Sequence, residues 1–400
     1  MWGWSVRYRQ KLIVAATAAV VLALPAAAKQ TVQTVQTVQT GQATQAAMQG
    51  TALRAPKVTS DIEIDYGDWT GFLRQTVLEA GMPDRASLGR PRPESDTKLI
   101  LGNRKKTRAE GNRLFYHLIT EKGIEALGRM KRSLGDTAAD PVFDTLRADE
   151  RLALWLNLHN IAVVELVAAN YPTKDTQSLV EAALDEKTVL IGDALWSIRD
   201  IETHVMTKWQ DPLVIYGFHR GHIGSPDIQR NAFTGETVWQ ALERNAREFT
   251  SGLRGFQYKR EKGKVSAFYA SVDQVFPDFE GDLKDHMTRH ATAYLVSKIL
   301  NADTLRPTIE DGTVSDLYQG VTYNHQGSYV QSGLWQADGA FFGDPNEVGL
   351  RRGRGLQYPA HVARYLGEMI KKRNRQHLEG QVTIESLQPA ESPSNAGKSK

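Results

Sequence analysis

Cysteine is absent from the 400 residues of this chain. Its absence excludes disulfide bridges, thiol catalysis and any zinc or iron–sulfur site with cysteine ligands. The sequence also lacks the glycine-rich loops that bind nucleotide phosphates, the H-E-x-x-H pair of zinc peptidases and the acidic loop of an EF-hand. We therefore expect no cofactor and assign no metal centre from motifs.

Long apolar runs are scarce as well. The run Leu12–Leu24 has about 13 residues, whereas a helix that spans a bilayer needs about 20. Basic residues precede it, and Ala26–Ala28 provides an Ala-x-Ala cleavage site before Lys29. The pattern predicts a cleaved signal peptide at 1–28 and an exported, periplasmic protein; an uncleaved anchor is the alternative. After removal of the signal, we expect no transmembrane span.

A large excess of positive charge is also missing. The formal net charge is +3, and residues 1–28 contain three bases and no acid, so that the mature chain is close to neutral. Proteins that bind nucleic acid through phosphate contacts usually carry a basic patch or stripe. The expected partner is therefore not a nucleic acid.

Composition divides the rest of the chain into segments. Residues 29–58 are rich in Gln and Thr and contain TVQTVQTVQT, which predicts a disordered tether. Residues 59–325 are predicted to form the globular core. Residues 326–377 form a C-terminal extension that includes a basic helix, and residues 378–400 are predicted to be a disordered tail.

The most apolar stretch of the core runs from Asp149 to Pro172. Its apolar residues cover every side of a helix, which predicts a helix buried in the middle of the domain. Asn157, His159 and Asn160 lie at its centre, with both amides on one side and the histidine pointing away. Because an unpaired buried amide costs about 1–3 kcal/mol, these amides either tie down a loop or line a binding site.

Helical periodicity elsewhere outweighs strand patterns. Helices are predicted near 70–80, 112–119, 123–134, 178–184, 197–206, 238–253, 281–300 and 358–375, and strands at 213–218, at 264–269 and within 305–356. The strands are too few and too far apart for a doubly wound nucleotide fold. The prediction is a helix-rich α+β fold with a small sheet.

Candidate chemistry lies where the predicted strand 213–218 leads through a loop to a predicted helix beginning at Ser225. Backbone N–H groups at a helix N-terminus stabilise an anion or a developing oxyanion. Ser225 is thus a candidate nucleophile, with His219 as its base and Glu202 or Asp200 as the group that orients the base. His222 and His204 are alternative bases. The competing interpretation is that Ser225 only caps the helix.

The same histidines offer a second chemistry. His219 and His222 are three residues apart in a glycine-containing loop, and with His204 or Glu202 they could hold a metal ion. This spacing is a weak signal because the loop supplies no third ligand.

Three motifs in order resemble the hallmarks of the bacterial and plant family that carries domain of unknown function 547. LALWLNLHNIA at 152–162 resembles lAFWiNlYNal, with His159 in place of the usual tyrosine. SIRDIET at 197–203 resembles sLddIEh, and IYGFHRGHIGSPDI at 215–228 resembles hfaLNCgs.sCPpl. The resemblance covers about 65–324 and is best over 147–253.

The two cysteines of that family fall on Arg220 and Ser225. A cysteine at a helix N-terminus, near His and Asn, implies an arrangement similar to papain- or transglutaminase-like thiol hydrolases. Serine keeps the cap but not the acidity of a thiol. The resemblance and the loss of both cysteines therefore predict a non-catalytic or degenerate binding module.

The resemblance implies a cleft between the central helix, the Glu202 helix and the 219–225 loop. Asn157, Asn160, His204 and His222 are the predicted binding residues, and the ligand is a peptide, a glycan or a protein partner. The alternative is a hydrolase or acyl transferase that uses Ser225.

Overall fold

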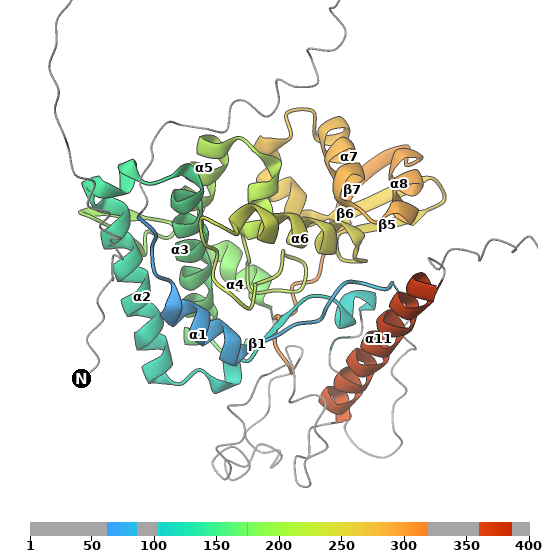
Figure 1. The fold of residues 1–400 in the computed structure, drawn as a ribbon, viewed down its shortest axis with the longest axis horizontal. Helices are drawn as coiled ribbons and strands as arrows, with labels where there is room; N and C mark the ends of the chain where they lie inside the picture. The colour runs from blue at the N-terminus through green and yellow to red at the C-terminus, as the bar shows by residue number, and fades with distance from the viewer. Residues whose placement is uncertain (1–61, 86–102, 104, 174, 319–359, 386–400) are drawn as a thin grey trace, which may run out of the picture.

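The computed structural model describes residues 62–85, 103, 105–173, 175–318 and 360–385 (Figure 1). The predicted signal peptide and tether lie outside these residues, as do most of the C-terminal extension and of the tail. The predictions for those segments are therefore not tested by the fold.

Helices dominate the described residues. The α-helices are α1 (Gly67–Thr76), α2 (Glu121–Ala139), α3 (Ala148–Ala169), α4 (Thr176–Ala183), α5 (Ile198–Trp209), α6 (Val238–Ser251), α7 (Phe279–His290), α8 (Ala293–Leu300) and α11 (Ala360–Glu385). Short 3-10 helices connect them: η1 (Lys106–Ala109), η2 (Tyr116–Leu118), η3 (Pro141–Thr145), η4 (Pro212–Gly217) and η5 (Ala267–Val275).

The strands form three small sheets. β1 (Val77–Leu78) pairs with β2 (Arg113–Leu114), and β3 (Val189–Ile191) forms an antiparallel hairpin with β4 (Ala194–Trp196). β6 (Lys262–Ser266) is central in the third sheet, antiparallel to β5 (Phe256–Lys259) and parallel to β7 (Thr304–Ile309). The predicted class, a helix-rich α+β fold with small sheets, is confirmed.

Helix α3 is the core of the molecule, as its composition predicts. Most of its residues are buried, and it contacts α2, α4, α5 and α6 (Figure 1). By length and composition it could cross a membrane, but most of its apolar stretch is buried inside the protein. We therefore interpret α3 as the core helix of a globular domain.

Local signals also place the start of α5 correctly. The Ser197 hydroxyl accepts the Asp200 N–H at 3.1 Å, and the Asp200 carboxylate accepts the Ser197 N–H at 2.7 Å. These reciprocal bonds are the capping box that the sequence predicts. The cap fixes the first turn of the helix that carries Glu202.

Two predicted elements near the site are wrong. Residues 213–218 form η4 instead of a strand, because the Asp211 carboxylate accepts the Leu213 N–H at 3.0 Å and Pro212 favours a helical first turn. Residues 226–229 are not helical, so that Ser225 caps no helix. The backbone of the 221–224 segment bonds instead to the distant segment 311–315.

Three other expectations also need correction. The predicted helix at 112–119 is replaced by β2 and η2, and the predicted helix at 281–300 is divided into α7 and α8 at Ala291. Helix α11 continues to Glu385, so that residues 378–385 of the predicted disordered tail are helical.

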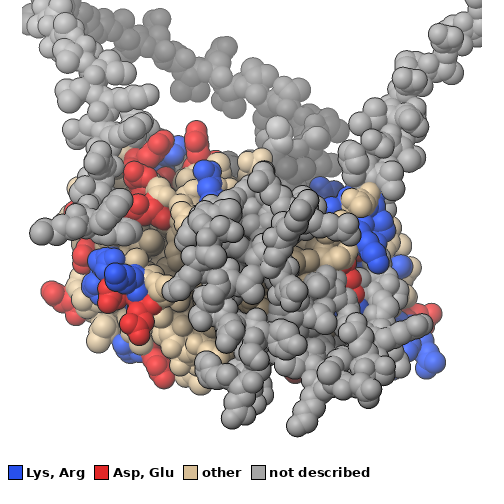
Figure 2. All heavy atoms as spheres, turned by 90° about the horizontal axis from the view of Figure 1, so that it is seen from below, with Lys and Arg blue, Asp and Glu red and all other residues tan. Residues whose placement is uncertain are grey.

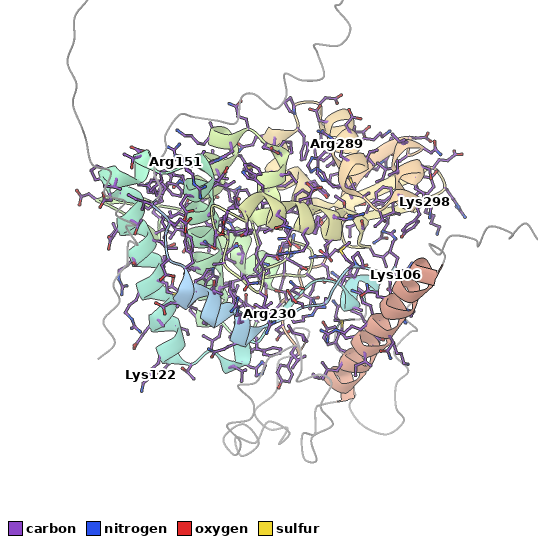
Figure 3. All side chains as sticks on the ribbon, in the orientation of Figure 1. Lys106, Lys122, Arg151, Arg230, Arg289 and Lys298 are labelled. Atoms are coloured by element: carbon purple, nitrogen blue, oxygen red, sulfur yellow. The ribbon has the colours of Figure 1, made fainter. Side chains whose placement is uncertain are left out.

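Charged residues of both signs are mixed over the described surface. Figure 2 shows Lys and Arg interspersed with Asp and Glu along its visible left edge. Lys122, Arg151, Arg289 and Lys298 lie far apart around the periphery in Figure 3.

Candidate functional site

Glu202 is the centre of a buried ionic cluster. It extends from α5 and is 1% exposed. Arg220 binds both of its carboxylate oxygens, with Nε–Oε1 at 3.0 Å and Nη2–Oε2 at 2.7 Å. His159 Nε2 lies 3.0 Å from Oε1. The remaining Arg220 nitrogen, Nη1, donates to the Ser271 hydroxyl at 2.8 Å.

This environment keeps Glu202 ionised. Burial alone would raise the pKa of the Glu202 carboxyl, but the charge of Arg220 and the hydrogen bond from His159 outweigh it and lower the pKa to about 2. Since Arg220 and His159 occupy the carboxylate, Glu202 does not contact His219, the histidine that it was predicted to orient.

The two asparagines of α3 tie down loops. Asn157 donates to the Phe233 carbonyl at 2.8 Å and accepts the Phe233 N–H at 3.0 Å. The Asn160 carbonyl oxygen accepts the His219 N–H at 3.2 Å and lies 3.0 Å from His159 Nδ1. Helical geometry predicts that His159 points away from both amides. This prediction is wrong for Asn160, because its carbonyl oxygen contacts the His159 ring.

Ser225 uses its hydroxyl to hold the backbone of its own loop. The oxygen accepts the Arg220 N–H at 3.1 Å, and the hydroxyl donates to the His222 carbonyl at 2.8 Å. The residue is 0% exposed. A serine nucleophile needs a base within hydrogen-bond reach, and both bonds of this hydroxyl are made to the backbone.

His219 and His222 are buried and bonded to carbonyl groups. His219 Nδ1 donates to the Pro226 carbonyl at 2.9 Å, and His222 Nδ1 donates to the Asp311 carbonyl at 3.3 Å. Burial lowers the pKa of His219 to about 4 and that of His222 to about 3. Both rings are therefore neutral at neutral pH.

His204 lies apart from this cluster. It is half-buried among tryptophans, with ring centroids 4.6 Å from Trp155, 5.6 Å from Trp196 and 6.5 Å from Trp209. Of the seven predicted residues, the structure therefore groups Asn160, Glu202, His219, His222 and Ser225 around one buried loop. Asn157 and His204 have separate partners.

These positions do not form a metal site. Among the described residues, no group of three His, Asp or Glu side chains is placed to hold a metal ion. The candidate ligands are used elsewhere, because His219 and His222 bond to carbonyls and Glu202 is paired with Arg220.

A second ionic cluster at the same loop was missed by the sequence reasoning. Arg254 Nη1 donates to the Ile223 carbonyl at 3.2 Å and to the Ser225 carbonyl at 2.5 Å, and its Nη2 donates to Asp227 at 2.8 Å. The residue is 1% exposed. Arg220 and Arg254 thus fix the 219–227 loop from two directions. The sequence offered no signal for this, because both arginines look like ordinary surface residues.

An open groove lies beside residues 311–315, the segment whose backbone bonds to this loop. It has a volume of about 500 Å³, and Gly312 and Thr313 form part of its wall. Its other lining residues are polar: Lys105, Asp175, Gln177, Ser178, Glu181 and Glu310. Hydrogen bonds from Ser178 hold the pKa of Asp175 below its usual range, which favours a charged carboxylate there.

Fold and site define a helix-rich α+β domain whose polar motif residues are buried and bonded within the protein. Residues 143–250 match a family model described as Protein of unknown function, DUF547, in agreement with the resemblance that the three motifs predict. The match extends from η3 to α6 and includes all three motifs and the buried loop. No curated protein and no solved structure matches the chain, so that the papain-like arrangement stays a prediction.

Proposed function

We propose that this protein is an exported, periplasmic DUF547 module that binds a polar ligand and does not catalyse a reaction at Ser225. The observation that carries the proposal is the hydrogen bonding of Ser225, whose buried hydroxyl is committed to two backbone groups of its own loop. Export is inferred from the sequence of residues 1–28.

The residue at the position of the first family cysteine supports this proposal. Arg220 occupies that position, and its guanidinium fills the space beside Glu202 and lies 5.2 Å from the centre of the Phe268 ring. A thiolate or a substrate carbonyl would have to displace a buried, bidentate ion pair. Removing one partner of such a pair costs about 3–5 kcal/mol, so the arrangement favours a structural role.

The 500 Å³ groove is the surface that this proposal assigns to the ligand. Its lining carries three carboxylates and one ammonium group, together with an amide and hydroxyl groups. Such a lining suits a ligand with many hydroxyl or amino groups, and therefore a glycan or a short peptide. The groove adjoins Asp311, whose carbonyl binds Gly224 and His222 of the motif loop.

A serine-directed phosphonate tests the absence of catalysis. We expect the full chain to show no labelling of Ser225 by intact-mass and peptide mass spectrometry, because the hydroxyl has no base within reach. The Ser225→Ala variant is the matched control for background labelling. Adduct formation at Ser225, abolished in the variant, would support the hydrolase or acyl-transferase alternative instead.

Charge reversal tests the groove. A panel of oligosaccharides and lysine-containing peptides can be screened against the protein by native mass spectrometry. For a ligand found in this way, Glu181→Arg with Glu310→Arg should weaken binding by about tenfold or more. Glu125→Arg, at an exposed acid of α2 outside the groove, is the control. Equal binding by all three proteins would place the ligand elsewhere.

A further inference from the structure

Three buried carboxylates meet around Arg254, beneath helix α11. Asp227 and Glu248 both pair with its guanidinium. Glu110 accepts the Arg254 N–H at 2.9 Å and the Leu253 N–H at 2.8 Å. One guanidinium therefore faces three acids in a region closed to solvent.

The cluster is short of positive charge. Burial raises the pKa of Glu248 to about 8 even though Arg254 opposes the shift, and burial also raises the pKa of Glu110. One carboxylate oxygen of Glu248 has no hydrogen-bond partner in the structure. A further cation at this position is therefore favoured by electrostatics.

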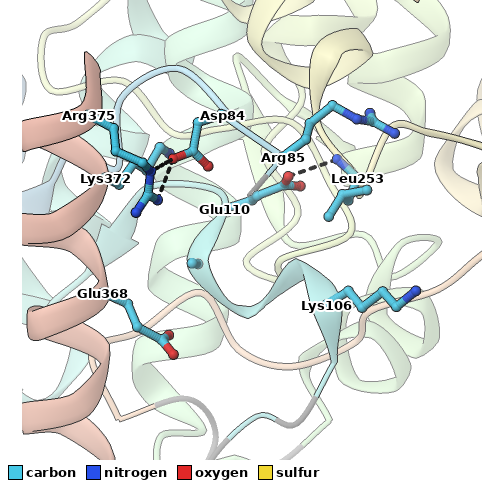
Figure 4. A pocket seen from close by; sticks show the side chains of 9 residues that line it. Asp84, Arg85, Lys106, Glu110, Leu253, Glu368, Lys372 and Arg375 are labelled. Carbon is cyan, nitrogen blue, oxygen red and sulfur yellow. Dashed lines mark hydrogen bonds and ion pairs between the residues drawn. The ribbon is translucent and has the colours of Figure 1, made fainter. Parts of the chain in front are cut away.

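Lys372 of α11 is a further cation close to these acids, although it forms no ion pair with them. Its side chain is 3% exposed and donates to the Gly81 carbonyl at 3.1 Å. It lines a small pocket with Glu110, Asp84 and Arg85, shown in Figure 4. Burial lowers the pKa of Lys372, whereas the Glu248 and Glu110 carboxylates favour its charged form. The lysine is thus buried beside acids that favour its charged form.

The rest of the α11 interface combines polar and apolar contacts. Arg373 donates to the Glu79 carbonyl at 3.2 Å, Arg375 Nε binds Asp84 at 2.8 Å, and Glu368 pairs with Arg108 at 3.0 Å. The fully buried apolar contacts of the helix come from Val362, Tyr365 and Met369, which pack in a small cluster separate from the main core. Mixed interfaces of this kind between parts of one chain resemble transient protein–protein contacts.

We propose that the surface beneath α11 is a binding site for a basic helix of a partner protein, and that α11 occupies it as a resident ligand. The recognised feature is a buried lysine beside Glu110 that binds the Gly81 carbonyl, flanked by arginines that bind Asp84 and the Glu79 carbonyl. This inference rests on the proposed role of the protein as a binding module.

The site is also connected to the motif loop. Glu110 holds the backbone of Arg254, and the Arg254 guanidinium holds the Ser225 carbonyl. A basic partner helix would replace α11 without disturbing these contacts, because it restores the missing cation. An empty site would leave the acids with Arg254 alone.

Peptide competition with the full chain tests the proposal. The probe is a fluorescent peptide of residues 360–385, and binding is measured by fluorescence anisotropy. The wild-type chain should bind it weakly, because its own helix competes at an effective concentration on the order of millimolar. Lys372→Met in the chain should strengthen peptide binding by about tenfold or more, since the resident helix loses its buried cation.

Lys371→Met is the matched control, since it removes the same charge from an exposed neighbouring position of α11. It should bind the peptide as the wild type does, and a peptide with Lys372→Met should not bind to any of the chains. Absence of peptide binding to the Lys372→Met chain, or equal binding by both chain variants, would overturn the proposal.

A second variant keeps the test valid if Lys372→Met does not fold, which circular dichroism would show. Glu368→Gln with Arg375→Gln weakens α11 at its outer ion pairs and leaves the buried lysine in place. This chain should also bind the peptide more tightly than the wild type does. If this chain does not bind the peptide more tightly and the phosphonate leaves Ser225 unlabelled, only the α11 site is refuted. If the phosphonate labels Ser225, the proposed function is refuted.

Discussion

Arg220→Ala is expected to lower the free energy of unfolding by about 3–5 kcal/mol, because it leaves the Glu202 carboxylate buried without its main counter-charge. The variant also removes the bonds from Arg220 to both oxygens of Glu202 and to Ser271. Urea denaturation followed by tryptophan fluorescence measures the effect. Trp155 and Trp196 lie near α5 and report on its packing.

A double-mutant cycle separates the ion pair from general packing. Arg220→Met with Glu202→Leu removes both charges, and the double variant should lose less stability than the sum of the single variants. The control is the exposed pair Lys187–Asp200, where Lys187→Ala should cost about 0–1 kcal/mol. Additive losses at Arg220 and Glu202 would show that the pair is not coupled.

Acidification from pH 6.5 toward pH 4 is expected to reduce stability through four buried histidines. Burial lowers the pKa of His117, His222 and His286 to about 3 and that of His219 to about 4. In this window the unfolded chain binds protons at these histidines and the folded chain does not. The stability that the four neutral rings contribute is therefore present above the pKa of the unfolded chain and is lost as the pH falls. Each contributes a slope of about 1.4 kcal/mol per pH unit.

Glu248 has the opposite effect on stability as the pH falls. The pKa of Glu248 is raised to about 8, so that its protonation favours the folded state below that pH. A comparison of the wild type with His222→Asn cancels this contribution. The variant keeps a donor for the Asp311 carbonyl, and its slope between pH 4 and 6 should be smaller by about 1.4 kcal/mol per unit. Identical slopes would mean that His222 gains no proton when the chain unfolds, so that it is already protonated in the folded chain.

The sequence predicted correctly what depends on neighbours along the chain. The apolar residues on every side of α3 indicate burial whatever the partners are, and Ser197 with Asp200 specifies a cap within one helical turn. The three motifs identified the family because their order and spacing are properties of the sequence. The same reasoning foresaw that the amides of α3 need partners, and left open whether those are loops or a ligand.

Only the tertiary structure decided what the polar residues do. Ser225-Pro226-Asp227 has the local pattern of a helix start, yet pairing of the 221–224 backbone with 311–315 outweighs that preference. Glu202 and His219 are both buried at the same loop, but Arg220 and His159 take the carboxylate. The Lys372 ammonium lies beneath α11 near acids more than a hundred residues away in sequence. Such pairings depend on distance in space, which residue types and spacing do not encode.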